Sequence, residues 1–320
     1  MAREWVNALG SDEIRELRQL SDLRSAWTIA VNWGLVAAAM AAVAVAPAAV
    51  LPAVVVLALF VIGSWQLGMA IVMHDAAHRT LFRSRSWNDR LGNWLAAYPA
   101  YLSLELYRPD HLQHHAHTGT DDDPDIALAR GWPVSRASLR RKIVRDLAGI
   151  TGIRRLIEQT AFLIATARGT QRERSAVVGF VGTGSAATAR AALVGAAMSQ
   201  IALVLVCTAA GHPLLYLLWV VAWLTTYSLC MRIRSIAEHA MTGDASDPLA
   251  NTRTVVAGPW ERLFIAPNRV NYHLEHHLVM TIPHYNLPRM HDLLQRRGLL
   301  DGAHVATSYL AVLRRVVTDA

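Results

Sequence analysis

Two long stretches of this chain are apolar throughout. Residues 25–73 and 191–231 contain no Asp, Glu, Lys or Arg. An α-helix needs about 20 residues to cross a bilayer, so each stretch is too long for one span and suits two. Pro and Gly residues break each stretch near its middle. The pattern predicts four membrane-spanning helices, arranged as two hairpins, at about residues 26–46, 51–73, 191–210 and 214–231.

The remaining segments mix apolar and polar positions and predict additional helices. Residues 90–106 are apolar but too short to cross a bilayer, and their aromatic residues are typical of an interfacial or re-entrant segment. Residues 140–169 combine Arg clusters with Ile and Leu at helical spacing. This spacing predicts an amphipathic helix, either on the bilayer surface or on a helical cap. Residues 302–320 show a similar pattern.

Together these elements define an all-α integral membrane protein. We expect residues 1–320 to form a single domain, in which residues 74–190 and 232–320 make a cytosolic helical cap. The composition agrees, because 53% of the residues are hydrophobic, more than a soluble domain usually contains. The alternative is a soluble protein with very apolar core helices, and the complete lack of charge in both stretches opposes it.

The distribution of charge predicts the orientation of the chain in the membrane. Neither predicted hairpin turn contains Lys or Arg, whereas residues 80–190 are rich in Arg. By the positive-inside rule, both termini, the middle segment and all the His-rich motifs then face the cytoplasm. Lys142 is the single Lys of the chain, a composition typical of GC-rich bacterial genomes. We therefore expect a bacterial inner-membrane protein.

The net charge of +7 also bears on the choice of partners. A nucleic-acid partner is not expected, because the Arg residues are dispersed along membrane-proximal segments and are not gathered with aromatic stacking residues. Anionic lipid headgroups and an acidic protein partner explain the charge more simply.

Three short His-rich motifs follow or precede the predicted apolar elements. HDAAH places His74 and His78 four residues apart, HLQHH begins at His111, and HLEHH begins at His273. At 100° per residue, positions i, i+3 and i+4 of a helix lie on one side within about one turn, so each motif presents its imidazoles in a common direction. The second pattern occurs twice in a chain with only 14 His. We infer that it was selected for its chemistry.

These motifs and the His that follows the fourth predicted span give nine candidate metal ligands. They are His74, His78, His111, His114, His115, His239, His273, His276 and His277. Nine imidazoles are too many for one metal ion, whereas two ions with four or five nitrogen ligands each would fit. Imidazole suits Fe, Zn and Cu, and the spacing alone does not choose between them.

Carboxylates usually orient metal-bound imidazoles through hydrogen bonds. Asp75, Glu238 and Glu275 lie beside candidate ligands in the sequence and are the expected partners. The acidic run Asp121, Asp122, Asp123 and Asp125 offers further candidates for this role, but we interpret it as a solvated loop or helix cap. Four other His are predicted to be surface or packing residues, namely His212, His284, His291 and His304. His117 could be either a metal ligand or a surface residue.

Other metal chemistries lack their motifs in this sequence. There is no Glu-x-x-His pair of the soluble carboxylate di-iron bundles and no H-E-x-x-H zinc-protease motif. The three His motifs, divided by two apolar hairpins, instead resemble the membrane-bound fatty acid desaturase superfamily, which includes acyl-lipid and acyl-thioester desaturases, fatty acid hydroxylases, and carotenoid hydroxylases and ketolases. The stretch NYHLEHHLVMTIPHYNLP, residues 271–288, is especially similar to the third-motif region of that superfamily.

This resemblance implies a di-iron centre held by His at the cytosolic face, which uses O2 to oxidise an unactivated C–H bond. It also implies two electrons from an external donor, because the chain contains no haem, flavin or Cys-rich iron–sulfur motif. The basic cytoplasmic surface would suit an acidic ferredoxin or a cytochrome-type donor.

One position departs from the superfamily. Stearoyl-type members have Asn as a water-mediated ligand where this chain has Ser235. A tenth ligand would then come from Asn271, from His117 or from a water molecule held by Ser235.

Three functions fit the motifs. Desaturation of a lipid- or thioester-linked acyl chain is the first, and hydroxylation or ketolation of a lipid or carotenoid shares every ligand with it. The third is a His-rich membrane metal transporter or sensor. Against that function, the predicted spans lack the ionisable residues that conduction near the bilayer midplane requires.

Overall fold

The computed structural model describes residues 9–170, 182, 184–243 and 245–318. Four helical segments among these residues are long and apolar enough to cross a membrane. They are α3 (Asp22–Val45), α4 (Leu51–Ala77), α10 (Ala186–Ala209) and the segment Pro213–His239, which comprises η4 (Pro213–Leu215), α11 (Tyr216–Leu224) and α12 (Thr226–His239). The prediction of four candidate spans is confirmed by length and composition.

Two of these segments extend beyond their predicted ends. α4 continues to Ala77, and the fourth segment continues to His239. His74 and His239 therefore belong to the long helices themselves and not to the segments that follow. The fourth segment is interrupted at Thr225, whose φ of −113° and ψ of −85° are not helical.

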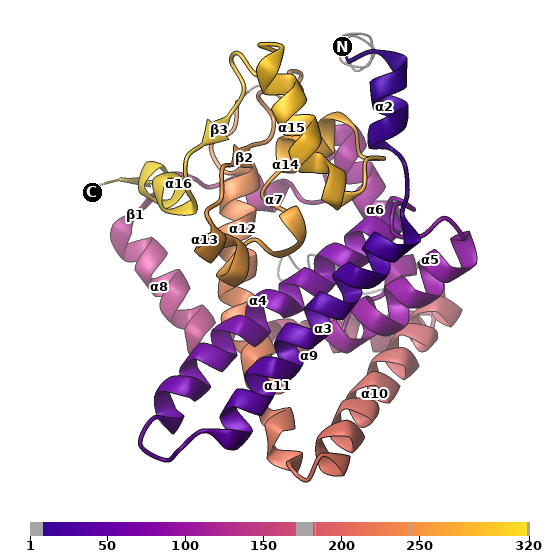
Figure 1. The fold of residues 1–320 in the computed structure, drawn as a ribbon, viewed down its shortest axis with the longest axis vertical. Helices are drawn as coiled ribbons and strands as arrows, with labels where there is room; N and C mark the ends of the chain where they lie inside the picture. Colours follow the sequence, from indigo (N-terminus) through magenta and orange to yellow (C-terminus); the bar gives the residue numbers. More distant parts are fainter. Residues whose placement is uncertain (1–8, 171–181, 183, 244, 319–320) are drawn as a thin grey trace.

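α4 is the central helix of the molecule. Every residue from Ile62 to Ala77 is buried, and α3, α11 and α12 all pack along it (Figure 1). A helix that is apolar on all sides suits such an environment. The first half of α4 is different, because Val56 and Leu57 are more than half exposed. The His-bearing end of α4 is therefore the part that its neighbours hold in place.

The remaining spans are not arranged as two equivalent pairs. α3 and α4 pack closely against each other, but α10 packs mainly against α9 (Ile150–Ala167), whereas α11 packs against α4. α9 and α8 (Arg136–Leu147) occupy the region predicted as one amphipathic helix, and Gly149, with a φ of +77°, separates them. Ile153 and Ile157 of α9 are exposed, which suits a helix that lies against lipid.

The other elements form the cap and its connections. The short helices are α2 (Ser11–Leu17), α5 (Arg85–Gly92), η1 (Asn93–Ala97), η2 (Tyr98–Ala100), α6 (Leu104–His117), α7 (Ile126–Ala129), α13 (Pro259–Phe264), η5 (Pro267–Arg269), α14 (His273–Leu278), η6 (His284–Asn286), α15 (Leu287–Arg296) and α16 (Tyr309–Arg315). Two parallel pairings join distant segments, β1 (Val134–Ser135) with β4 (Val317–Thr318) and β2 (Thr254–Val255) with β3 (Val305–Ala306).

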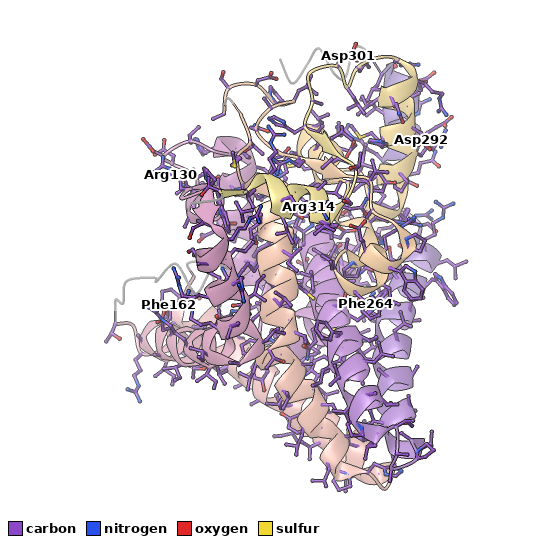
Figure 2. The ribbon with its side chains drawn as sticks, turned by 90° about the vertical axis from the view of Figure 1, so that its left-hand side faces the viewer. Arg130, Phe162, Phe264, Asp292, Asp301 and Arg314 are labelled. Atoms are coloured by element: carbon purple, nitrogen blue, oxygen red, sulfur yellow. The ribbon has the colours of Figure 1, made fainter. Side chains whose placement is uncertain are left out.

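The two ends of the molecule differ in character. Figure 1 shows α14, α15 and α16 at one end, together with α2, while the α3–α4 and α10–α11 turns lie at the other end. The first and last described helices are thus on the side of the cap. Figure 2, from a perpendicular direction, shows the long helices below the cap elements.

The contact between α4 and α12 depends on a glycine. A Cβ atom at Gly63 would lie 2.2 Å from Thr226 Oγ1 and 2.6 Å from the backbone nitrogen of Tyr227. Both distances are far below van der Waals contact, and a backbone nitrogen does not move aside as a flexible side chain can. Gly63 therefore sets how closely α12, which carries His239, approaches α4.

We predict that Gly63→Ala lowers the thermal stability of the detergent-solubilised protein, because overpacking of a close helix contact costs about 1–3 kcal/mol. Gly34→Ala in α3 is the matched control, since no heavy atom lies within 4 Å of the added Cβ and Ala favours a helix by about 1 kcal/mol over Gly. Thermal melts of the two variants test this. Equal melting temperatures would show that the contact tolerates a methyl group.

Candidate metal centre

The structure brings all nine candidate His together as two clusters. The five-His cluster consists of His74, His78, His111, His115 and His276, and the four-His cluster consists of His114, His239, His273 and His277. Within each cluster, one ring nitrogen of every His lies within 4.8 Å of the others. Both groupings are geometries that could hold a metal ion.

Each cluster draws on helices that are distant in the sequence. His74 lies in the last turn of α4 and His78 directly after it, whereas His239 ends α12. α6 and α14 supply the remaining six. In both of these helices the adjacent His pair is divided, so that His115 and His276 face the five-His cluster while His114 and His277 face the other. The two HxxHH motifs therefore serve both clusters at once.

The distances between ring nitrogens suit shared coordination. The Nε2 atom of His111 lies 2.8 Å from His78 Nε2 and 3.1 Å from His115 Nε2. His273 Nε2 lies 3.0 Å from His239 Nε2 in the other cluster. Two nitrogens bound at right angles about 2.1 Å from one ion are separated by about 3 Å. The Nε2 atoms thus converge as metal ligands do.

Three buried ring nitrogens in these clusters have no hydrogen-bond partner among the described residues. They are both ring nitrogens of His74 and Nε2 of His277. Buried polar atoms are rarely left unpaired unless something else binds them. Their placement fits a site that a metal ion completes.

Burial keeps these imidazoles neutral. It lowers the pKa of His78, His111 and His115 well below the usual value, and the charges of neighbouring His add to the effect. The same causes lower the pKa of the three α14 His well below the usual value. Only a deprotonated nitrogen binds a metal ion, so the clusters are prepared for one at neutral pH.

Asp123 orients a His of the four-His cluster. His114 Nδ1 lies 2.8 Å from Asp123 Oδ1, and the backbone N–H groups of Gly119 and Asp125 also donate to this carboxylate. The backbone bonds and His114 both hold the pKa of Asp123 below its usual value, against the effect of burial. Our interpretation of the acidic run as a solvated loop is therefore wrong for Asp123. It is correct for Asp121 and Asp122, which are exposed.

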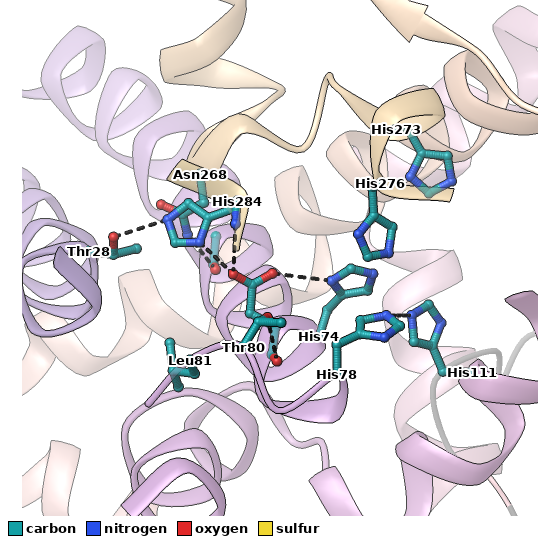
Figure 3. Close-up of polar contacts among 12 residues, drawn as sticks. Thr28, His74, His78, Thr80, Leu81, His111, Asn268, His273, His276 and His284 are labelled. Atoms are coloured by element: carbon teal, nitrogen blue, oxygen red, sulfur yellow. Dashed lines mark hydrogen bonds and ion pairs between the residues drawn. The ribbon is translucent and has the colours of Figure 1, made fainter. Parts of the chain in front are cut away.

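Asp75 links His74 of the five-His cluster to His284, a buried His outside both clusters. Its Oδ1 lies 3.5 Å from His74 Nδ1, an ion-pair distance, and its Oδ2 lies 2.5 Å from His284 Nδ1. His284 Nε2 in turn lies 3.1 Å from the hydroxyl of Thr28 on α3 (Figure 3). His284 is 5% exposed. The prediction that His284 is a surface or packing residue was wrong in its chemistry, because the side chain binds a carboxylate.

Glu275 has other partners than the sequence predicts, whereas Glu238 lies beside the candidate ligand His273. Glu275 accepts a hydrogen bond from His291 Nδ1 at 2.6 Å and another from the Thr254 hydroxyl. The bond to Glu275 raises the pKa of His291, so the prediction of a surface or packing role for His291 is also corrected. Glu238 accepts from Arg234 Nε at 2.7 Å and lies 3.6 Å from His273 Nδ1.

The remaining candidates lie outside the clusters. His117 and His212 are exposed and His304 is partly exposed, and Ser235 is buried on α12 one turn before His239. The Asn271 amide nitrogen donates to the Val255 carbonyl oxygen at 2.9 Å, while its oxygen is buried without a partner. The tenth ligand therefore stays a prediction. For His284, the one available sequence signal was its position inside the stretch 271–288.

Comparison with known proteins assigns the fold and the site to a family. The sequence model of the fatty acid desaturase family matches residues 46–308. The chain belongs to the fatty acid desaturase family. The match includes all nine His of the two clusters, and membership of the fatty acid desaturase family implies that the protein is an oxidoreductase.

A relative in this family has a named activity. The chain is 29% identical over 240 residues to dihydrorhizobitoxine desaturase of Bradyrhizobium elkanii. The similar region covers 71% of this chain and 63% of that protein. The chain therefore matches less than two thirds of the length of this relative.

We predict that Asp123→Asn weakens metal binding at the four-His cluster by about 10–100-fold, because an outer carboxylate fixes the orientation and basicity of its His. Metal retained per chain after dialysis against increasing chelator measures this. Asp122→Asn is the control, since Asp122 is exposed. Identical retention in the two variants would remove the role that we assign to Asp123.

Proposed function

We propose that this protein is an O2-dependent di-iron desaturase that introduces a double bond into a fatty acyl chain. The observation that carries the proposal is the division of nine His into clusters of five and four. Membership of the fatty acid desaturase family supports iron among the metals that imidazole accepts. Iron bound at the two clusters would supply the activation of O2 and the oxidation of an unreactive C–H bond.

The protein's own residues prepare this chemistry in three ways. The nine imidazoles offer convergent ring nitrogens, and Asp123 and Glu238 lie beside the Nδ1 atoms of two of the rings. The buried ends of α4 and α12 fix His74 and His239. Burial of the clusters excludes water, which would otherwise compete with the substrate carbon for the oxidant.

The electron balance requires a partner. Reduction of O2 to two water molecules takes four electrons, and formation of one C=C bond from CH2–CH2 releases two electrons and two protons. The other two electrons and two protons must come from outside the substrate. We propose an external protein donor of the ferredoxin or cytochrome type, supplied by its own reductase.

An apolar surface supports a hydrocarbon substrate. An open apolar depression of about 650 Å³ on the protein surface is lined by Pro52, Val56, Leu57 and Phe60 of α4 and by Phe264 of α13. Figure 2 labels Phe264 at the level where the long helices meet the cap. A groove of this composition favours an acyl chain over a polar molecule. Because one relative is named dihydrorhizobitoxine desaturase, dihydrorhizobitoxine is the second substrate to test, after acyl chains.

We also propose that the two clusters face the cytoplasm of a bacterium from its inner membrane. The turns at the opposite end, at residues 46–50 and 210–212, contain no Lys or Arg. α8 and α16 on the cap side are rich in Arg. This asymmetry supports a cytoplasmic cap by the positive-inside rule.

Lipid and metabolite profiling of cells that express the chain, with and without a matched ferredoxin and reductase, tests the activity. We expect acyl chains lighter by two hydrogens that appear only with the complete system. A new hydroxyl or ketone would assign the protein to hydroxylation or ketolation instead. Exchangeable zinc without O2 consumption would indicate a metal transporter or sensor.

We predict that His114→Ala and His276→Ala each abolish turnover and lower the metal content from about two ions per chain to about one, because each removes a ligand from a different cluster. His212→Ala is the control, since His212 is exposed in the turn before η4 and is not a candidate ligand. Activity and iron per chain measure the outcome. Full turnover in either cluster variant contradicts the assignment of its cluster.

A further inference from the structure

One side of the cap carries a dense group of positive charges. Arg140, Arg141 and Arg145 of α8 are exposed, as are Arg314 and Arg315 of α16. None of these five side chains makes an ion pair with another described residue. We call these five residues the basic face. Figure 2 looks onto this side of the molecule and shows Arg314 at its centre, with Arg130 at the same level.

The charge on the basic face is not balanced by α8 itself. The single carboxylate of α8, Asp146, is buried and forms a two-pronged ion pair with Arg232 of α12. It is therefore turned inward and already neutralised. Arg130 nearby is paired with the exposed Asp121, and such a surface pair contributes little to the field. A net positive surface remains.

Strand pairing holds the two parts of the basic face together. β1, which directly precedes α8, pairs with β4 after α16, so that Val134 lies opposite Val317 and Ser135 opposite Thr318. α8 and α16 also both pack against α12. α12 is the helix that ends in His239. The positions of the charges are thus fixed relative to the four-His cluster.

A polar cavity leads from this side of the cap to the cluster. The cavity has a volume of about 340 Å³, and both Trp132 and the cluster residue His239 line it. Lys142 of α8 lies 6.0 Å from the centre of the Trp132 ring. Trp132 therefore borders both α8 and the cavity that His239 lines.

We propose that the basic face is the docking surface of an acidic one-electron carrier protein, which delivers electrons to the four-His cluster along the cavity that Trp132 and His239 line. This rests on the proposed desaturase function. For each double bond formed, two carrier molecules each give up one electron. These two electrons, with two protons from solvent, join the two electrons and two protons from the substrate to reduce O2 to two water molecules. Opposite charge on the carrier speeds its encounter with the basic face by about 10–1,000-fold.

The placement of the face favours a protein over the membrane surface. The apolar residues exposed on this part of the chain are Val144 and Leu147 at the end of α8 and Ile150 and Ile153 at the start of α9. Those residues suit the bilayer. Arg140 and Arg141 lie one turn before Val144 on α8, and Arg314 and Arg315 belong to α16, so the charge extends from the edge of the lipid-facing segment onto the cap.

Binding of an acidic [2Fe–2S] ferredoxin to the full-length protein in phosphatidylcholine nanodiscs tests the docking surface. We expect binding that weakens with salt, and a loss of about tenfold or more in affinity for Arg141→Glu/Arg314→Glu. The control is Arg85→Glu/Arg90→Glu on α5, which changes the net charge equally. α5 lies on the opposite side of the molecule from α8 (Figure 1), and the control should bind as the unmodified protein does.

A second measurement separates docking from the chemistry of the site. Stopped-flow reduction of the iron-loaded protein by ferredoxin should slow in Arg141→Glu/Arg314→Glu, while reduction by a small viologen should not change. The proposal is overturned if the affinity for ferredoxin is the same with and without the substitutions, or if the unmodified protein does not bind ferredoxin. The proposal is also overturned if Arg141→Glu/Arg314→Glu binds ferredoxin as the unmodified protein does and only copurifies with less phosphatidylglycerol. Absence of any oxidised product, with docking intact, would instead refute the desaturase function.

Discussion

The structure depends on holding nine imidazoles close together in a largely buried space. Each protonated ring would repel its neighbours in a region that water screens poorly, and burial, together with the neighbouring His, lowers the pKa of rings such as His78 and His111 well below the usual value. The rings must also be directed, because Nε2 atoms of His78 and His111 approach to 2.8 Å. The helices around α4 satisfy both demands by enclosing the rings and fixing their directions.

The carboxylates around the clusters solve a related problem. An isolated buried charge is costly, so each of these acids has further partners. Asp123 receives two backbone N–H bonds, Glu238 pairs with Arg234, and Asp75 binds His284. These contacts also connect separate elements. The series of polar contacts from His74 through Asp75 and His284 to Thr28 joins α4, η6 and α3 (Figure 3). The partners that orient the His therefore also hold the cap to the long helices.

Much of the arrangement could be predicted from the sequence because its signals are local. An uncharged stretch of suitable length indicates a span, and His at helical spacing indicate a common direction. The division into five and four is not local, since it depends on how α6 and α14 face each other. Partners such as Asp123 and His291 follow from the same packing. The break at Thr225 has no proline or glycine to mark it, so it was not foreseen.

The two clusters differ in their surroundings, and this difference suggests different tasks. The five-His cluster lies at the buried end of the central helix α4, and His74 and His78 are themselves buried. The four-His cluster includes His239, which lines a polar cavity. Charge moves more readily where polar groups are available to respond to it, whereas an unreactive hydrocarbon favours apolar walls. A division in which electrons arrive beside the four-His cluster and the substrate lies beside the five-His cluster agrees with these surroundings, since Trp132 and His239 line the same polar cavity.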